Sequence, residues 1–154
     1  KFMMNGALTI GTLDGANVEM HEVLGDENMF LFGLKTEEVK EMRDTGYNPY
    51  RLYSRDGALH RVLDQISKGF RDGIRYDDIV ERLLFGGGSP ADEYMLLADF
   101  VSYADAMRRV ADTYGDRAKW NQMSLHNIAR SGIFAADRSI ADYAETIWHV
   151  PYKK

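Results

Sequence analysis

Lys1 is the residue whose neighbours best suit covalent chemistry, because the apolar run Phe2–Met4 follows it directly. A lysine among apolar side chains loses hydration, which favours the neutral amine, and a neutral amine can form an imine with a carbonyl group. Lysines beside apolar residues also commonly extend their ammonium group into solvent. The residue types alone therefore leave two interpretations open, a nucleophilic amine and a solvated side chain.

The histidines occur without the spacing that metal or nucleophilic chemistry needs. None lies at a metal-ligand distance in sequence from another, and neither HExxH nor GxSxG occurs. We interpret all four as surface or helix-face residues: His21, His60, His126 and His149. The sequence does not decide whether one of them belongs to a Ser–His–Asp site. The sequence predicts no metal site.

The glycine run Gly86–Ser89 has the composition of a phosphate-binding loop but not its chemistry. It lacks the Lys-Ser/Thr pair of a P-loop, and Pro90 follows where a helix N-terminus would have to bind the anion. Glycine runs of this kind usually form turns. We therefore interpret this segment as a flexible surface turn.

Composition narrows the class of protein. The chain has 154 residues, 45% of them hydrophobic and 28% charged, which suits one globular domain. Its 19 basic and 24 acidic residues give a net charge of −5 without a basic block, which argues against nucleic acid and anionic membranes as partners. There are no cysteines, no apolar run long enough to cross a membrane and no signal peptide, and we expect a cytoplasmic protein.

The first third of the chain predicts a parallel α/β arrangement. Residues 7–12 and 28–33 are short apolar runs bounded by glycine, which is typical of buried strands. Asp14 is expected to cap a helix that ends at Gly25, and Thr36 is expected to cap a second helix. Strands alternating with helices in this way are the pattern of a parallel sheet covered by helices.

The remainder predicts helices and one more strand, at residues 94–100. Apolar side chains recur at helical spacing in the segments 59–70, 79–84, 103–114, 116–128 and 139–148. About three strands are too few for a doubly wound sheet, which usually has about five or six. The chain also opens inside an apolar stretch. We therefore expect the helix-rich C-terminal part of a larger doubly wound α/β domain, and a piece of a longer protein.

A resemblance to a known family covers most of the chain. Residues 1–19 closely resemble the pyridoxal-phosphate segment of the α-glucan phosphorylases, the family of glycogen, starch and maltodextrin phosphorylases. The resemblance continues, in the family's order and approximate spacing, at residues 28–33, 120–124, 127–134, 137–140 and 143–148. The segment from Tyr47 to Tyr94 is less distinctive.

The resemblance implies a fold, a reaction and a site. The fold would be the Rossmann-like, glycosyltransferase-type domain. The reaction would be cleavage of α-1,4-glucosidic bonds by inorganic phosphate, giving glucose 1-phosphate, in a cytoplasmic homodimer. Lys1 would be the catalytic and cofactor-binding residue, holding pyridoxal 5'-phosphate as an imine, and the cofactor's phosphate group would exchange a proton with the substrate phosphate. Gly6, Gly11 and Gly15 would allow close packing around it, and Asp14 and Asn17 would brace the following turn.

In that family the other groups that bind the two phosphates lie upstream of the position of Lys1. We therefore expect residues 1–154 alone to be inactive, to bind the cofactor weakly or not at all, and to self-associate through exposed apolar faces, including strand edges near Ile10 and Phe30. The alternative is a non-catalytic helical interaction module with phosphorylase-like sequence. A different pyridoxal-phosphate enzyme is disfavoured because the C-terminal segments resemble the same family.

Overall fold

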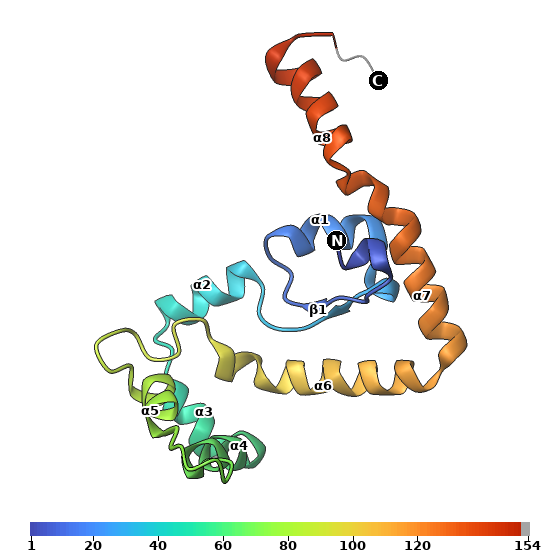
Figure 1. Ribbon diagram of the computed structural model, residues 1–154. Helices are drawn as coiled ribbons and strands as arrows, with labels where there is room; N and C mark the ends of the chain where they lie inside the picture. Colours follow the sequence, from blue (N-terminus) through green and yellow to red (C-terminus); the bar gives the residue numbers. More distant parts are fainter. Residues whose placement is uncertain (152–154) are drawn as a thin grey trace. The chain divides into compact units, whose positions relative to one another are not determined.

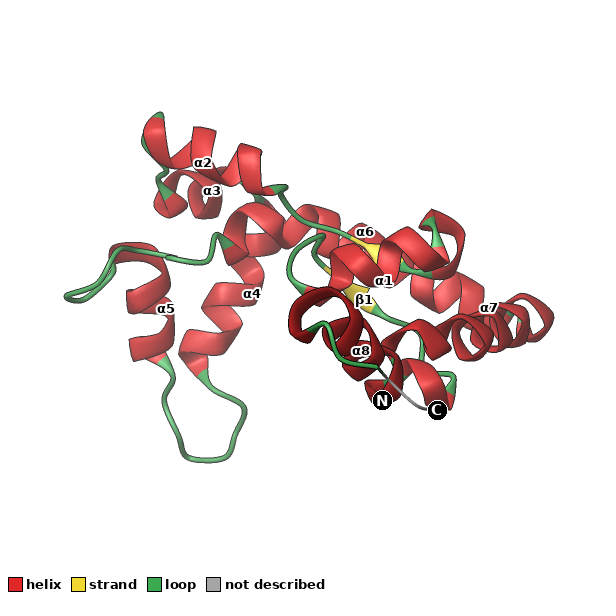
Figure 2. Cartoon of the chain, turned by 90° about the horizontal axis from the view of Figure 1, so that it is seen from above, coloured by secondary structure: helices red, strands yellow, loops and turns green. Residues whose placement is uncertain are grey.

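The computed structural model describes residues 1–151 and is dominated by helices (Figures 1 and 2). One small sheet pairs β1 (Ile10–Gly11) with β2 (Phe30–Leu31). The Phe30 N–H donates to the Thr9 carbonyl at 2.9 Å and the Phe32 N–H donates to the Gly11 carbonyl at 3.1 Å, so the strands run parallel. The two predicted strands are confirmed in place but are much shorter than expected.

The prediction of a third strand at residues 94–100 is wrong. Helix α6 (Leu96–Gly115) occupies most of this segment, and the described residues hold two strands instead of about three. The Asp92 carboxylate accepts the N–H groups of Leu96 at 2.9 Å and Leu97 at 2.8 Å, which satisfies two of the free donors at the start of this helix. Leu97 and Phe100, at helical spacing, both pack on the hydrophobic core.

The chain divides into two compact units. The first combines Lys1–Ile10, Gly15–Phe30 and Arg109–Lys154, and the second combines Gly11–Asp14 with Leu31–Arg108. No helix within residues 1–151 has both the length and the apolar character to cross a membrane.

The first unit joins the two ends of the sequence. Its N-terminal part holds the 3-10 turn η1 (Met3–Asn5), helix α1 (Ala16–Leu24) and the 3-10 turn η2 (Asp26–Asn28). Its C-terminal part holds α7 (Arg117–Arg130), η3 (Ser131–Phe134), α8 (Ala136–Tyr143) and the π-helical segment η4 (Ala144–Trp148).

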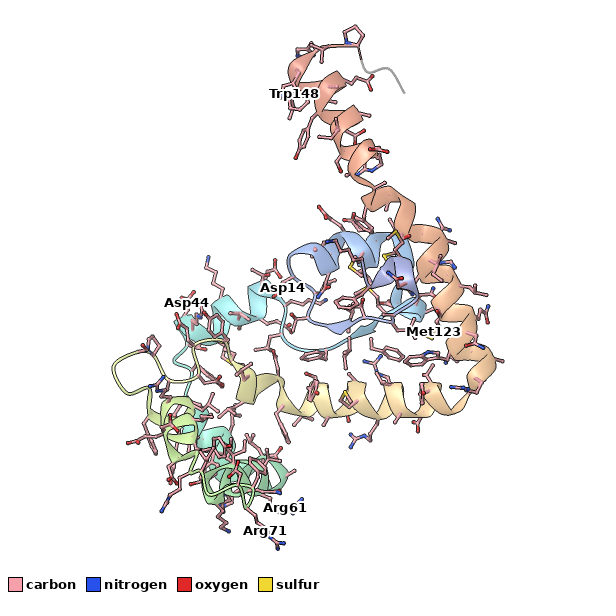
Figure 3. All side chains as sticks on the ribbon, in the orientation of Figure 1. Asp14, Asp44, Arg61, Arg71, Met123 and Trp148 are labelled. Carbon is pink, nitrogen blue, oxygen red and sulfur yellow. The ribbon has the colours of Figure 1, made fainter. Side chains whose placement is uncertain are left out.

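Helix α7, orange in Figure 1, packs against η1, α1 and η2. Asp116, the first residue of the predicted segment 116–128, caps it by accepting the Lys119 N–H at 3.1 Å. Met123, labelled in Figure 3, is buried on it, and Trp120 lies beside Phe30 with 6.4 Å between ring centroids. The Phe30 side chain is therefore buried, and the exposed strand edge expected near Ile10 and Phe30 stays a prediction.

The second unit is helical apart from its share of the sheet. It holds α2 (Thr36–Asp44), α3 (Pro49–Arg55), α4 (Gly57–Lys68), α5 (Asp77–Phe85) and the first part of α6. Lys35 stands at the N-cap of α2, so the prediction that Thr36 caps this helix is wrong. Figure 2 shows α3, α4 and α5 as separate red helices joined by loops. The buried leucines of this unit form its core: Leu59, Leu63, Leu84 and Leu97. The predicted apolar stripe of α4 thus supplies two core residues.

A buried carboxylate fixes the loop that leads into α6. Asp92 is 4% exposed and accepts three hydrogen bonds, from the two α6 amides and from the Tyr47 hydroxyl at 2.6 Å. Burial, together with this bond to Asp92, raises the pKa of Tyr47 well above its ordinary value, so the hydroxyl keeps its proton and remains a donor. The Asp92 backbone has φ 43°, in the left-handed region.

The turn after β2 is held by the same helix. The Gly33 N–H donates to Ser102 Oγ at 3.0 Å, and the Leu34 N–H donates to Asp99 Oδ1 at 2.8 Å. Burial raises the pKa of Asp99 above its ordinary value. Gly33 has φ +83°, and a Cβ there would lie 2.8 Å from both Asp99 Oδ2 and Thr12 Cγ2. Only glycine suits this position.

Gly33→Ala is accordingly expected to destabilise the protein more than Gly46→Ala. Both positions have positive φ, but a Cβ at Gly46 meets no atom within 4 Å, so this control carries only the backbone strain. The steric conflict at Gly33 should add about 1–3 kcal/mol to the loss in free energy of unfolding, measured by urea denaturation. Equal losses for the two variants would contradict the close packing described for this turn.

Candidate functional site

Lys1 lies at the edge of a pocket in the first unit, with a volume of about 430 Å³. The N-terminal segment, α1 and the segment from η3 to the start of α8 form its wall. Methionine, alanine and phenylalanine side chains make most of the lining: Lys1, Met3, Met4, Ala16, Glu19, Met20, Ser131, Gly132, Phe134, Ala135 and Ala136. Lys1 itself is exposed. The structure thus places the predicted site residue beside a largely apolar hollow.

The polar groups of this pocket suit covalent attachment of a cofactor to Lys1 better than they suit the binding of a phosphate group. Lys1 supplies a primary amine, Ser131 a hydroxyl and Glu19 a carboxylate. A phosphate dianion is normally bound by several cationic or N–H donors. Among the lining residues that the structure describes, Lys1 is the one cation, and a lysine used as a covalent tether loses that charge-pairing role. The lining therefore fits the carbonyl end and the ring of pyridoxal phosphate, but not its phosphate group.

Backbone hydrogen bonds close the turn that carries Lys1. The Asn5 N–H donates to the Phe2 carbonyl at 2.9 Å and the Gly6 N–H donates to the Met3 carbonyl at 3.0 Å. The Asn5 side-chain amide returns to the Lys1 carbonyl at 2.8 Å. Met3, 5% exposed, points into the unit's interior and anchors the turn. Lys1 is therefore attached to an ordered turn and not to a free strand.

Gly6 ends this turn in the left-handed conformation, with φ +78°, and lies close to α7. Its carbonyl accepts the Ser124 hydroxyl at 2.8 Å, across 118 positions of sequence. A Cβ on Gly6 would lie 2.4 Å from Ser124 Oγ and 3.2 Å from Ile128 Cδ1. The expected role of Gly6 in close packing is confirmed at this position.

Asn127, which no sequence motif marks as functional, is completely buried on α7. Its side-chain amide donates to the Asn28 carbonyl at 3.1 Å and to the Met123 carbonyl at 3.0 Å. Within residues 1–151, its buried Oδ1 has no hydrogen-bond partner. The available signal was an amide on the apolar face of α7, four residues after Met123.

The other predicted residues are not among the described residues that line the Lys1 pocket. Gly15, with φ 48°, stands at the N-cap of α1, so the expectation that Asp14 caps this helix is wrong. A Cβ at Gly15 would meet no atom within 4 Å, so the expected close packing at this glycine is also wrong. Asn17 lies in the first turn of α1. Gly86–Gly88 all have positive φ and form a turn before Pro90, as predicted.

The histidines are dispersed. His21 Nε2 lies 2.7 Å from Asp26 Oδ1, and His60 stacks on Tyr53 with 4.3 Å between ring centroids. His149 Nδ1 lies 3.0 Å from the Glu145 carbonyl oxygen. Over the described part of the chain, no three His, Cys, Asp or Glu side chains gather in a group that could bind a metal ion.

Comparisons with known proteins agree with the resemblance noted above. Residues 1–150 match the family model described as carbohydrate phosphorylase. The chain is 45% identical to a glycogen phosphorylase of Synechocystis sp., over 97% of this chain and 17% of that protein. It is 43% identical to the muscle form of glycogen phosphorylase of Ovis aries, over 97% of this chain and 18% of that protein.

A glycogen phosphorylase of Bacillus subtilis is 44% identical to the chain, over 97% of this chain and 19% of that protein. The chain thus spans less than a fifth of the length of these curated relatives. Because the family model covers nearly every residue, the chain belongs to the carbohydrate phosphorylase family.

Proposed function

We propose that this chain is the C-terminal portion of the cofactor-binding, doubly wound domain of a larger α-glucan phosphorylase. The intact enzyme would cleave α-1,4-glucosidic bonds with inorganic phosphate and release glucose 1-phosphate. The observation that carries the proposal is the place of Lys1, which opens the segment matched by the family and lines a largely apolar pocket. The match to the family favours a tethering role for this amine, while the Lys1 side chain itself is exposed in this chain.

The residues of this chain have a limited set of tasks in such an enzyme. Lys1 would bind pyridoxal phosphate through its amine, and Met3, Met20 and Phe134 would form an apolar wall that keeps water from the tether. When bound, the cofactor supplies a phosphate group that exchanges a proton with the substrate phosphate, as the resemblance implies. Glu19 and Ser131 would offer an acceptor and a hydroxyl at the rim of the same pocket.

The cationic and N–H groups that bind the two phosphates would come from upstream of Lys1. This division is supported by the pocket lining, where Lys1 is the one cation within residues 1–151, and by the share of the relatives that the chain covers. Each missing electrostatic group of this kind typically costs about 3 kcal/mol of transition-state stabilisation. Residues 1–154 alone would therefore be inactive. The homodimer and the cytoplasmic location stay predictions.

Borohydride reduction of the intact enzyme tests the role of Lys1. The reduced cofactor should be recovered on the Lys1 side chain by peptide mapping, and Lys1→Ala should abolish formation of glucose 1-phosphate from maltoheptaose and phosphate. Lys35→Ala is the matched control, because Lys35 is also exposed and lies outside the pocket. A stoichiometric label elsewhere, or an active Lys1→Ala variant, would refute the assignment.

The isolated 154-residue chain should behave differently under the same treatment. Without a phosphate site, its Lys1 amine competes with other exposed amines such as Lys35 and Lys119. The label should be weak, sensitive to salt and spread over several amines, and no glucose 1-phosphate should form. A stoichiometric label confined to Lys1 would mean that this chain contains a complete cofactor site, contrary to the division proposed here.

The rival function is that of a non-catalytic interaction module, and it predicts a shorter reading frame than the enzyme does. An enzyme requires a reading frame that continues for several hundred codons upstream of Lys1, whereas a module requires a start codon close to it. Exposed apolar side chains in and just after the last helical segments are the observation that favours the module: Ile140, Tyr143, Ile147, Trp148 and Val150. Figure 3 labels Trp148, which is 55% exposed.

These side chains also predict self-association of the isolated chain, because contiguous apolar surface drives association. Light scattering at micromolar concentration should detect dimers or larger species. The double substitution Ile147→Ser and Trp148→Ser should shift the population toward the monomer, whereas Val101→Ser, at an exposed valine of α6, should not. A chain that stays monomeric at these concentrations contradicts the prediction.

A further inference from the structure

We infer that helix α7 positions the cofactor lysine, and that Ser124 is a positioning residue which acts through the carbonyl of Gly6. The inference rests on the proposed function, since it assigns a role relative to the tether on Lys1. It goes beyond that function because Ser124 lies more than a hundred residues from Lys1 in sequence and does not line its pocket.

The turn after Lys1 couples the position of Gly6 to the position of Lys1, because hydrogen bonds close the turn. The Gly6 N–H donates to the Met3 carbonyl at 3.0 Å, and the Ala7 N–H donates to the Phe2 carbonyl at 3.1 Å. The Asn5 side chain holds the Lys1 carbonyl at 2.8 Å. A displacement at Gly6 therefore moves the peptide that bears Lys1, instead of being absorbed by a flexible segment.

The contact with α7 sets where this turn lies. The Ser124 hydroxyl donates to the Gly6 carbonyl at 2.8 Å, and the space where a Gly6 Cβ would lie is filled by Ser124 Oγ and Ile128 Cδ1. The glycine and the serine thus fit as a pair. Any larger residue at position 6 must displace the hydroxyl or move the turn away from the helix.

Helix α7 is a suitable support because other contacts fix it independently. Asn127, three residues after Ser124, is completely buried and bonds to the Asn28 carbonyl at 3.1 Å. Trp120, four residues before Ser124, packs against Phe30 and Tyr114 with ring-centroid distances of 6.4 and 5.0 Å. The helix is therefore anchored on both sides of the serine, and the Ser124 contact adds a fixed point for the Lys1 turn.

The experiment uses the intact phosphorylase with bound pyridoxal phosphate and follows the rate of cofactor release, together with the absorption and fluorescence of the bound cofactor. Ser124→Ala should release the cofactor about threefold faster, as expected for the loss of one hydrogen bond. Gly6→Ala should release it about tenfold faster or more, because small displacements of a reacting group are costly. Both variants should change the cofactor spectrum and lower kcat more than they raise KM.

A double variant and two controls separate positioning from general stability. Gly6→Ala with Ser124→Ala should be no worse than Gly6→Ala alone, since the added Cβ already displaces the hydroxyl. Ser124→Thr, which keeps the hydroxyl, should retain the original release rate. Gly25→Ala is the matched control, because Gly25 also has positive φ (+71°) but no atom within 4 Å of a Cβ; it should leave release and spectrum unchanged.

The outcomes distinguish the two proposals. Label on Lys1 in the unmodified enzyme, with unchanged release and spectrum in Ser124→Ala, would overturn the positioning role and leave the proposed function intact. Absence of label on Lys1 in the unmodified enzyme would overturn the proposed function and this inference with it. Ser124→Ala keeps the test decisive if Gly6→Ala fails to fold.

Discussion

The first unit depends on the close packing of α7 against the N-terminal segments. Helix α7 meets η1 at Gly6, η2 at Asn28 and the end of the sheet at Phe30. Each meeting point has a specific requirement: a residue without a Cβ, a buried amide and an aromatic pair. Because these requirements fall on one helix, the turn of Lys1, the wall of its pocket and the small sheet share a common support.

The features set by local sequence could be predicted. Helices with a clear apolar stripe and a capping residue, such as α4 and α7, appear where expected, and Leu59 and Leu63 of the α4 stripe are buried. The prediction of a strand at residues 94–100 was wrong because an apolar run of this length suits a strand and a helix equally well. Asp92 favours the helix, because this buried residue in the left-handed conformation caps α6 and is itself bonded to Tyr47, 45 positions away. Such a cap depends on tertiary structure and has no short-range signature.

In the candidate site, too, some features could be predicted from the sequence and others could not. Lys1 could be singled out because a long, specific resemblance begins with it, while its pocket could not, since residues from 1 to 136 line it. Ser124 and Asn127 look alike in sequence, both being polar residues on an amphipathic helix. Only their distances to Gly6 and Asn28 give them separate tasks. The groups that would bind phosphate lie outside what this chain supplies to the pocket.

The division of the chain into two units, the first of which joins both ends of the sequence, has a consequence for biosynthesis. Residues 31–108 of the second unit are contiguous and can form their helical core as soon as they leave the ribosome. The Lys1 turn emerges earlier but finds its support only when residues 117–130 appear, more than a hundred codons later. At about 5–20 residues per second, this interval lasts seconds, during which the segment around Lys1 lacks its final neighbours. Nascent chains are therefore exposed at the cofactor segment for longer than at any part of the contiguous core, and that segment is where chaperone binding or early capture of the cofactor would have the most time to act.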